Sequence, residues 1–121
     1  MKQFITIFVL FLMNATFAQD KNARASMEVD GVCGMCKERI EKAAIKTKGV
    51  KSAVWSIETH ELALIYDARK TNIDSISYNV AAVGHDTKVI KATEEAYLSV
   101  HTCCRYRDDE VQKDHDMDSK N

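Results

Sequence analysis

Cys33 and Cys36 form a Cys-x-x-Cys motif in the run Gly31 to Ile40. Two thiols at this spacing, one in a loop and one on the first turn of a following helix, can converge on a single soft ion. A helix N-terminus also favours a thiolate over a thiol through its exposed backbone N–H groups and its partial positive charge. The motif therefore indicates metal binding or thiol–disulfide chemistry, and its spacing alone does not choose between them.

Two further cysteines and two histidines are candidate ligands outside this motif. Cys103 and Cys104 are adjacent, so a bridge between them would strain disulfide geometry, and they follow His101 closely. We predict an auxiliary metal site here, either closing a four-thiolate site with the first pair or separate at the other end of the domain. The even cysteine count leaves ordinary disulfides as the alternative. His85 is a candidate third ligand or proton-linked gate, and a surface histidine is its alternative.

The hydrophobic pattern predicts an α+β domain. The predicted elements are a strand at 26–29, a helix at 36–48 ending at Gly49, strands at 50–57 and 62–66, a helix from Thr71 as N-cap to Gly84, and a strand at 86–91. This order is that of a ferredoxin-like βαββαβ sandwich, an antiparallel four-stranded sheet with two helices on one face. The last strand then lies beside the first, which brings His85 near the Cys33 loop.

The two ends of the chain differ from this domain in composition. Residues 1–18 resemble a secretory signal peptide, with Lys2, an apolar stretch too short to span a bilayer, and small residues at its end. We therefore expect export, with a periplasmic location and no stable membrane insertion once the signal is removed. Residues 19–25 form a linker, 26–92 the domain, 93–104 a cysteine-containing extension, and 105–121 a disordered polar tail.

Charge and surface patterning limit the partners. The formal net charge is −1, with no dense basic face, so we expect no nucleic acid partner. Val54, Ala63 and Ile65 make the sheet face opposite the helices unusually apolar. Residues 97–100 of the extension would cover it, or a partner would, including a second copy in a dimer.

Soft metal binding explains the motif better than redox catalysis does. A thioredoxin-like enzyme relies on a cis-proline facing its cysteines, and this chain has no proline. Two thiolates beside the apolar Met35 suit Cu(I) first, with Hg(II) and Cd(II) as alternatives. Zn(II) would need further ligands from Cys103, Cys104 or a histidine. No residue pattern indicates catalysis, so we do not expect an enzyme.

The motif on a strand–helix loop, the helix running to Gly49-Val50, the hairpin ending at Tyr66-Asp67, and Gly84 before a last strand resemble the heavy-metal-associated domain family. The resemblance covers residues 27–92. It implies that Cys33 and Cys36 are the ligands, that the ion passes by thiol exchange, and that the partner is a metal-transporting ATPase or efflux system.

The resemblance leaves two other functions open and is imperfect. One is a periplasmic Hg(II) carrier, and the other is a thiol–disulfide protein in which Cys103 and Cys104 resolve the first pair. Family members commonly carry a Gly-Met-Thr-Cys loop, whereas here Val32 precedes Cys33. His85 stands where many members have an aromatic residue.

Overall fold

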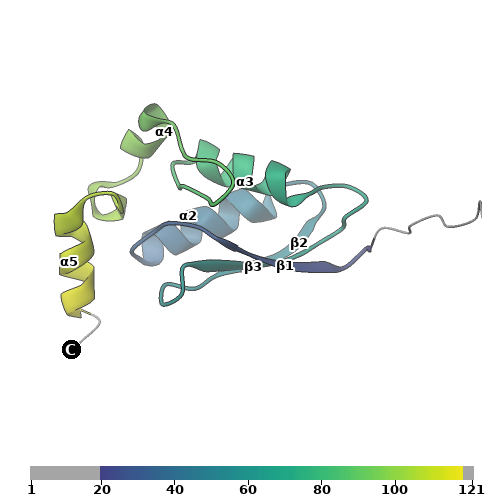
Figure 1. Ribbon diagram of the computed structural model, residues 1–121, viewed down its shortest axis with the longest axis horizontal. Helices are drawn as coiled ribbons and strands as arrows, with labels where there is room; N and C mark the ends of the chain where they lie inside the picture. Colours follow the sequence, from purple (N-terminus) through teal and green to yellow (C-terminus); the bar gives the residue numbers. More distant parts are fainter. Residues whose placement is uncertain (1–19, 119–121) are drawn as a thin grey trace, which may run out of the picture.

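The computed structural model describes residues 20–118 (Figure 1). Its elements, in chain order, are β1 (Ala23–Glu28), α2 (Gly34–Ile45), β2 (Val50–Trp55), β3 (Glu61–Tyr66), α3 (Ile73–Ala82), α4 (Glu94–Leu98), the 3₁₀ turn η2 (Thr102–Cys104) and α5 (Asp109–Asp118). The predicted signal peptide at 1–18 lies outside the described residues. Within the described part, no helix is long and apolar enough to cross a bilayer.

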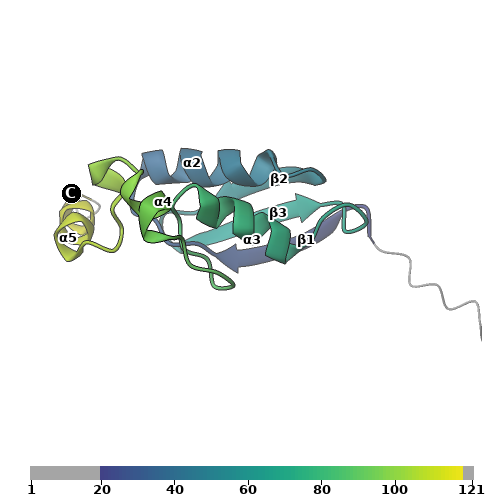
Figure 2. The same ribbon diagram turned by 90° about the horizontal axis from the view of Figure 1, so that it is seen from above.

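The sheet is antiparallel, and α2 and α3 pack on one of its faces (Figures 1 and 2). Its strand order is β1-β3-β2, with Glu28 opposite Glu61 and Trp55 opposite Leu62. These pairs bring the end of β1, the end of β2 and the start of β3 to one edge of the molecule. The predicted α+β architecture, with both helices on one face, is confirmed.

The predicted fourth strand is not confirmed, because the sheet has three strands within the described residues. An isolated antiparallel bridge between Val29 and Thr87 lies where that strand was expected. The Thr87 side chain then accepts from the backbone N–H of Ile90 and donates to its carbonyl, both at 3.0 Å. These bonds turn the chain away from β1 after one paired residue, so a ladder cannot continue.

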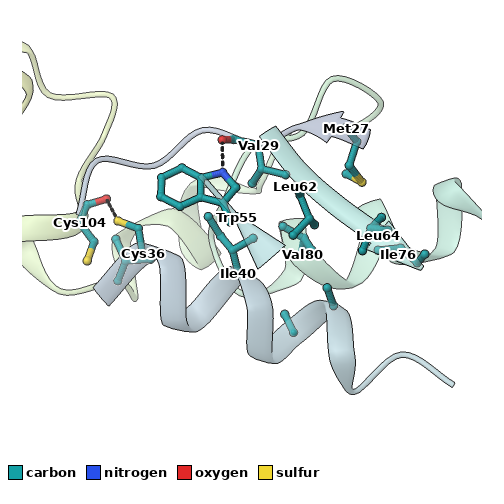
Figure 3. Packing of buried hydrophobic residues seen from close by; sticks show 13 residues of the cluster. Met27, Val29, Cys36, Ile40, Trp55, Leu62, Leu64, Ile76, Val80 and Cys104 are labelled. Carbon is teal, nitrogen blue, oxygen red and sulfur yellow. Dashed lines mark hydrogen bonds between the residues drawn. The ribbon is translucent and has the colours of Figure 1, made fainter. Parts of the chain in front are cut away.

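The hydrophobic core lies between the sheet and the two helices (Figure 3). Trp55, Leu62 and Leu64 point toward the helices and are almost completely buried, whereas Val54 is 54% exposed on the opposite face, as predicted. The buried cluster continues along α2 to Cys36 and across to Cys104 of the extension. The cysteine-bearing end is therefore part of the core.

Local signals account for most of the helix ends, although α2 is Gly34–Ile45 rather than the predicted 36–48. α2 begins immediately after Cys33, whose extended backbone makes it the N-cap. Gly49 has φ +99°, a conformation that glycine adopts without strain, where the chain turns into β2. The N-cap of α3 is Asn72 rather than the predicted Thr71, because the Asn72 side chain accepts from the N–H of Ser75 at 2.8 Å.

The extension packs against the end of the helical layer and leaves the open sheet face uncovered (Figures 1 and 2). Tyr97, Val100 and Tyr106 are buried there. Beyond the boundary predicted at Arg105 for a disordered tail, Tyr106 and Arg107 bond to the domain and α5 follows them, while the division of the chain into segments stays a prediction. Sequence composition signalled polarity in this segment but could not show the packing of two particular side chains. A dimer through the open face stays a prediction.

Candidate metal centre

The loop carrying Cys33 sits directly on the Trp55 ring. A Cβ added at Gly31 would lie 3.0 Å from two atoms of the ring and 3.1 Å from the Cys36 Cβ, so only glycine lets the loop approach so closely. The Trp55 indole N–H donates to the carbonyl of Val29 at 3.0 Å, which fixes the ring under the end of β1 (Figure 3). Trp55 therefore supports the loop that carries Cys33.

Polar contacts tie the start of α2 to the end of β2. The Lys37 ammonium donates to the Trp55 carbonyl at 2.7 Å and pairs with Glu41 at 3.2 Å. The Glu41 carboxylate in turn accepts from the backbone N–H of Trp55 at 3.2 Å. Because both contacts hold the first turns of the helix against β2, the Cys33–Cys36 segment has a fixed position.

The structure brings the thiols of both cysteine pairs to one end of the molecule. The Sγ of Cys33 lies 3.4 Å from that of Cys36 and 3.3 Å from that of Cys104. The Sγ atoms of Cys103 and Cys104 are 3.8 Å apart, and those of Cys33, Cys103 and Cys104 all lie within 4.8 Å of one another. No disulfide joins the four cysteines. The vicinal pair lies beside the motif, as one of the two predicted arrangements requires, but the candidate metal-ligating group in the described residues contains Cys33, Cys103 and Cys104 without Cys36.

The surroundings of Cys33 lower its pKa, unlike those of Cys36 and Cys104, the two thiols that it contacts. Burial acts to raise its pKa, but the backbone N–H of Cys36 and the thiols of Cys104 and Cys36 stabilise the anion and bring the pKa below the usual thiol value. Burial raises the pKa of Cys36 and, more strongly, that of Cys104. Cys33 is therefore easier to ionise than Cys36 and Cys104, the two thiols that it contacts.

Two soft or polar contacts complete the cluster. The Cys103 thiol lies 3.5 Å from the thioether sulfur of Met35, which is 47% exposed. The Cys36 thiol donates to the carbonyl of Cys104 at 3.9 Å (Figure 3). Cys36 and Cys104 are buried, while Cys33 and Cys103 are partly exposed, so an ion could enter or leave on the side of the latter two.

An ion pair and a tyrosine hold the extension in this position. The Arg107 guanidinium binds the Asp86 carboxylate through two nitrogens, at 2.6 and 3.0 Å, and donates to the Ala92 carbonyl at 3.0 Å. The Tyr106 hydroxyl donates to the Gly84 carbonyl at 2.7 Å and accepts from the N–H of Asp86 at 2.9 Å. We call Asp86, Tyr106 and Arg107 the extension latch.

The two candidate histidines lie outside the cysteine cluster. His85 is fully buried, stacks on Tyr106 and contacts the Asp30 carbonyl through Nδ1 at 2.8 Å. Because a carbonyl only accepts, Nδ1 carries the proton, and the buried Nε2 has no hydrogen-bond partner among the described residues. His101 is exposed, and its Nδ1 accepts from the N–H of Cys103 at 3.4 Å. Neither ring belongs to the metal-ligating group found in the described part of the chain.

Sequence reasoning missed the latch and the role of Trp55. Asp86 was assigned to a strand, and Tyr106 and Arg107 to the tail. The one available signal was the Tyr-Arg pair in an otherwise polar, acidic segment, since an aromatic residue there has no solubilising role.

Known proteins resemble this chain over the same region. A region of a copper-exporting P-type ATPase of Staphylococcus saprophyticus is 29% identical over 75 residues, which are 61% of this chain and 9% of that protein. The corresponding ATPase of Staphylococcus haemolyticus is 27% identical over 73 residues, again 9% of its length. The chain therefore spans a small part of the curated relatives it matches.

Solved structures share the fold. The CopZ metallochaperone is 27% identical, with a TM-score of 0.52, over 54% of this chain and 98% of that one. The N-terminal domain of a potential copper-translocating P-type ATPase from Bacillus subtilis, in its Cu(I)-loaded state, is 24% identical, with a TM-score of 0.53, over 55% and 85% of the two chains.

The family model for the heavy-metal-associated domain matches residues 26–96, which is more than half of the chain. The match includes the second half of β1, the Cys33–Cys36 loop, α2, β2, β3 and α3. The match ends at residue 96, before Cys103 and Cys104, so the vicinal cysteines lie outside the region that the family model matches. By sequence and by fold, this chain belongs to the heavy-metal-associated domain family.

Proposed function

We propose that this protein is an exported carrier that binds Cu(I) through Cys33 and Cys36 and passes it to a metal-transporting ATPase or efflux partner by thiol exchange. The observation that carries the proposal is the 3.4 Å separation of the two sulfurs at the N-terminus of α2. The shared fold with a metallochaperone and the similarity to copper-exporting ATPases support it. Thiolates are the ligands that soft ions prefer.

Ligand exchange needs a thiolate that an incoming sulfur can reach. Cys33 is partly exposed and has a lowered pKa, whereas Cys36 is buried at the base of the site. An incoming partner thiol would therefore meet the ion on the Cys33 side, with Cys36 released last. The location in the periplasm and the identity of the partner belong to this proposal.

The test is an anaerobic Cu(I) titration against a competing chelator. The Cys33→Ala, Cys36→Ala double variant should lose its high-affinity binding, because the ion would lose both ligands of the pair. Tyr78→Ser is a control, since Tyr78 is 65% exposed on α3 and makes no contact that the site uses. Wild-type affinity in the double variant would reject the proposal.

The same material tests the redox alternative. If the protein acted on disulfides, its reduction potential would lie near those of known thiol oxidants, and Cu(I) binding would be weak. A carrier should instead transfer copper to an isolated heavy-metal-associated domain before the two proteins, once mixed, are separated by gel filtration. Replacing Cu(I) with Hg(II) in that transfer separates a copper carrier from a mercury carrier.

A further inference from the structure

Cys33 is the shared member of two sets of thiols. On one side it lies 3.4 Å from Cys36, and on the other it lies 3.3 Å from Cys104. The three sulfurs of Cys33, Cys103 and Cys104 lie within 4.8 Å of one another and include both a loop thiol and a vicinal pair from the far end of the chain. The Cys33–Cys104 separation in the second set is as short as the Cys33–Cys36 separation in the motif.

The sulfur separations indicate how many thiolates one ion would have. With bonds of ~2.3 Å, three sulfurs around an ion lie about 4.0 Å apart, while two on opposite sides lie about 4.6 Å apart. The 3.8 Å separation of the Cys103 and Cys104 sulfurs is close to the first value, and the 3.3 Å separation of the Cys33 and Cys104 sulfurs would open by about 0.7 Å to reach it. A linear ion between Cys33 and Cys36 needs their 3.4 Å separation to open by more, about 1.2 Å.

The extension latch holds Cys103 and Cys104 in place beside Cys33. Tyr106 and Arg107 follow Cys104 by two and three residues and are fastened to Gly84 and Asp86. The η2 turn also has a backbone bond from the N–H of Cys104 to the carbonyl of His101 at 2.8 Å. Cys103 and Cys104 therefore have little conformational freedom to lose when they bind an ion.

We infer that Cys33, Cys103 and Cys104 form a three-thiolate site for a soft ion, with Cys33 shared between this site and the Cys33–Cys36 pair. The inference rests on the proposed function and adds that the extension supplies ligands of its own. The ion can then move between Cys36 and the vicinal pair while it stays bound to Cys33. Cys103, on the partly exposed side, is the ligand that meets the solvent.

The test compares variants loaded with one equivalent of Cu(I). X-ray absorption at the copper edge counts sulfur neighbours, and chelator competition gives the affinity. Wild-type protein should have three sulfurs, and the Cys103→Ser, Cys104→Ser variant should have two. The affinity of this variant should fall at least ~10-fold. Loss of a group that only supports a metal ligand already costs ~10–100-fold, and here ligands themselves are removed. Thr102→Ala, an exposed substitution in the same turn, is the matched control.

The single variants provide the sharpest contrast. Cys36→Ser should keep three sulfurs, while Cys33→Ser loses the member common to both sets and should weaken binding far more. A simple two-thiolate site predicts equal losses. Because Cys104 is fully buried, its substitution could disturb folding, and Trp55 fluorescence checks that each variant is folded. The Cys103→Ser single variant repeats the comparison at the more exposed thiol.

Two outcomes separate the proposals. Two sulfurs in the wild type, with unchanged affinity in the Cys103→Ser, Cys104→Ser variant, would overturn this inference and leave the proposed function standing. Absence of high-affinity Cu(I) binding in the wild type would reject both.

Discussion

At the scale of single residues, the four cysteines differ because their surroundings differ. Cys33 lies at the N-cap of α2, where backbone N–H groups favour its anion, while Cys36 and Cys104 are buried thiols. A soft ion replaces protons when it binds thiols, so binding releases them and becomes stronger as the pH rises. The buried thiols need this replacement most, because burial disfavours their anions in the absence of the ion.

His85 gives a residue-scale prediction that is independent of metal. Burial lowers the pKa of His85 from 6.5 to about 4, opposed by its bond to the Asp30 carbonyl. Between these two pKa values the unfolded chain binds a proton at His85 that the folded chain does not. The contribution of His85 to the free energy of unfolding is therefore fully present above pH ~6.5 and is lost as the pH decreases toward 4. At ~1.4 kcal/mol per pKa unit, the loss from this residue amounts to about 3 kcal/mol.

The measurement is urea unfolding of metal-free protein at pH 7 and pH 4.5. The His85→Phe variant should lose less stability between the two values than the wild type does, because it has no imidazole to protonate. His101→Ala, at an exposed position, should behave like the wild type. Equal pH dependence in wild type and His85→Phe would show that His85 is not the group responsible.

At the scale of elements, the latch controls whether the extension stays on the domain. In Arg107→Ala, the nearly buried Asp86 carboxylate loses its two-nitrogen partner, which should destabilise the closed extension by about 2 kcal/mol. The same change should raise the pKa of Asp86, which Arg107 holds below its usual value against the effect of burial. Alkylation of the buried Cys104 should become faster, as measured by mass spectrometry.

Arg69 provides the matched control for this prediction. It makes a similar two-nitrogen contact with Asp67, at 2.9 and 3.0 Å, in the loop after β3. Asp67 follows the end of β3 that lies away from the cysteines, because Cys33 follows the end of β1 that pairs with the start of β3. Arg69→Ala should leave Cys104 labelling unchanged. Equal acceleration in both variants would mean that general instability, rather than the latch, exposes Cys104.

A glycine of the helical layer gives a second prediction at this scale. Gly84 has φ +105°, and a Cβ there would lie 2.6 Å from the Ala96 carbonyl oxygen and from a Val100 methyl group. Gly84→Ala should therefore lower the free energy of unfolding by about 2 kcal/mol, from backbone strain and from the displaced α4 together. Thermal unfolding measures the loss. A variant as stable as the wild type would show that α4 does not pack closely here.

The elements that sequence predicted well are those with local signals. The 3.6-residue period of α2, the alternation in β2 and β3, and Gly49 at the turn each depend on neighbouring residues. The fourth strand was not confirmed because Thr87 turns the chain by bonding Ile90, and alternation in a short segment does not report such a bond. The spacing identified both cysteine pairs as candidate ligands. Their closeness in space could not be predicted, because it involves the extension latch, whose residues lie about twenty positions apart in sequence.

At the scale of the whole molecule, the extension and the domain share one core. Val100 and Cys104 belong to the same buried cluster as Trp55 and Ile40, and Tyr106 packs on His85. A small domain has a free energy of unfolding of only ~5–15 kcal/mol, so the free energy lost with these contacts would be a large fraction of it. With the extension latch intact, the extension is therefore expected to unfold with the domain as one cooperative unit.

Two probes in different parts of the chain test this cooperativity. Trp55, the single tryptophan, reports on the domain, and the alkylation of Cys104 reports on the extension. In a urea series on metal-free, reduced protein, both should give the same midpoint, because unfolding without intermediates makes all probes coincide. Cu(I) at 100 times its dissociation constant should then raise the stability seen by Trp55 by about 2.7 kcal/mol. Cys104 that reacts fully while Trp55 is still buried would instead make the extension a separately opening flap, able to uncover the ion while the domain stays folded.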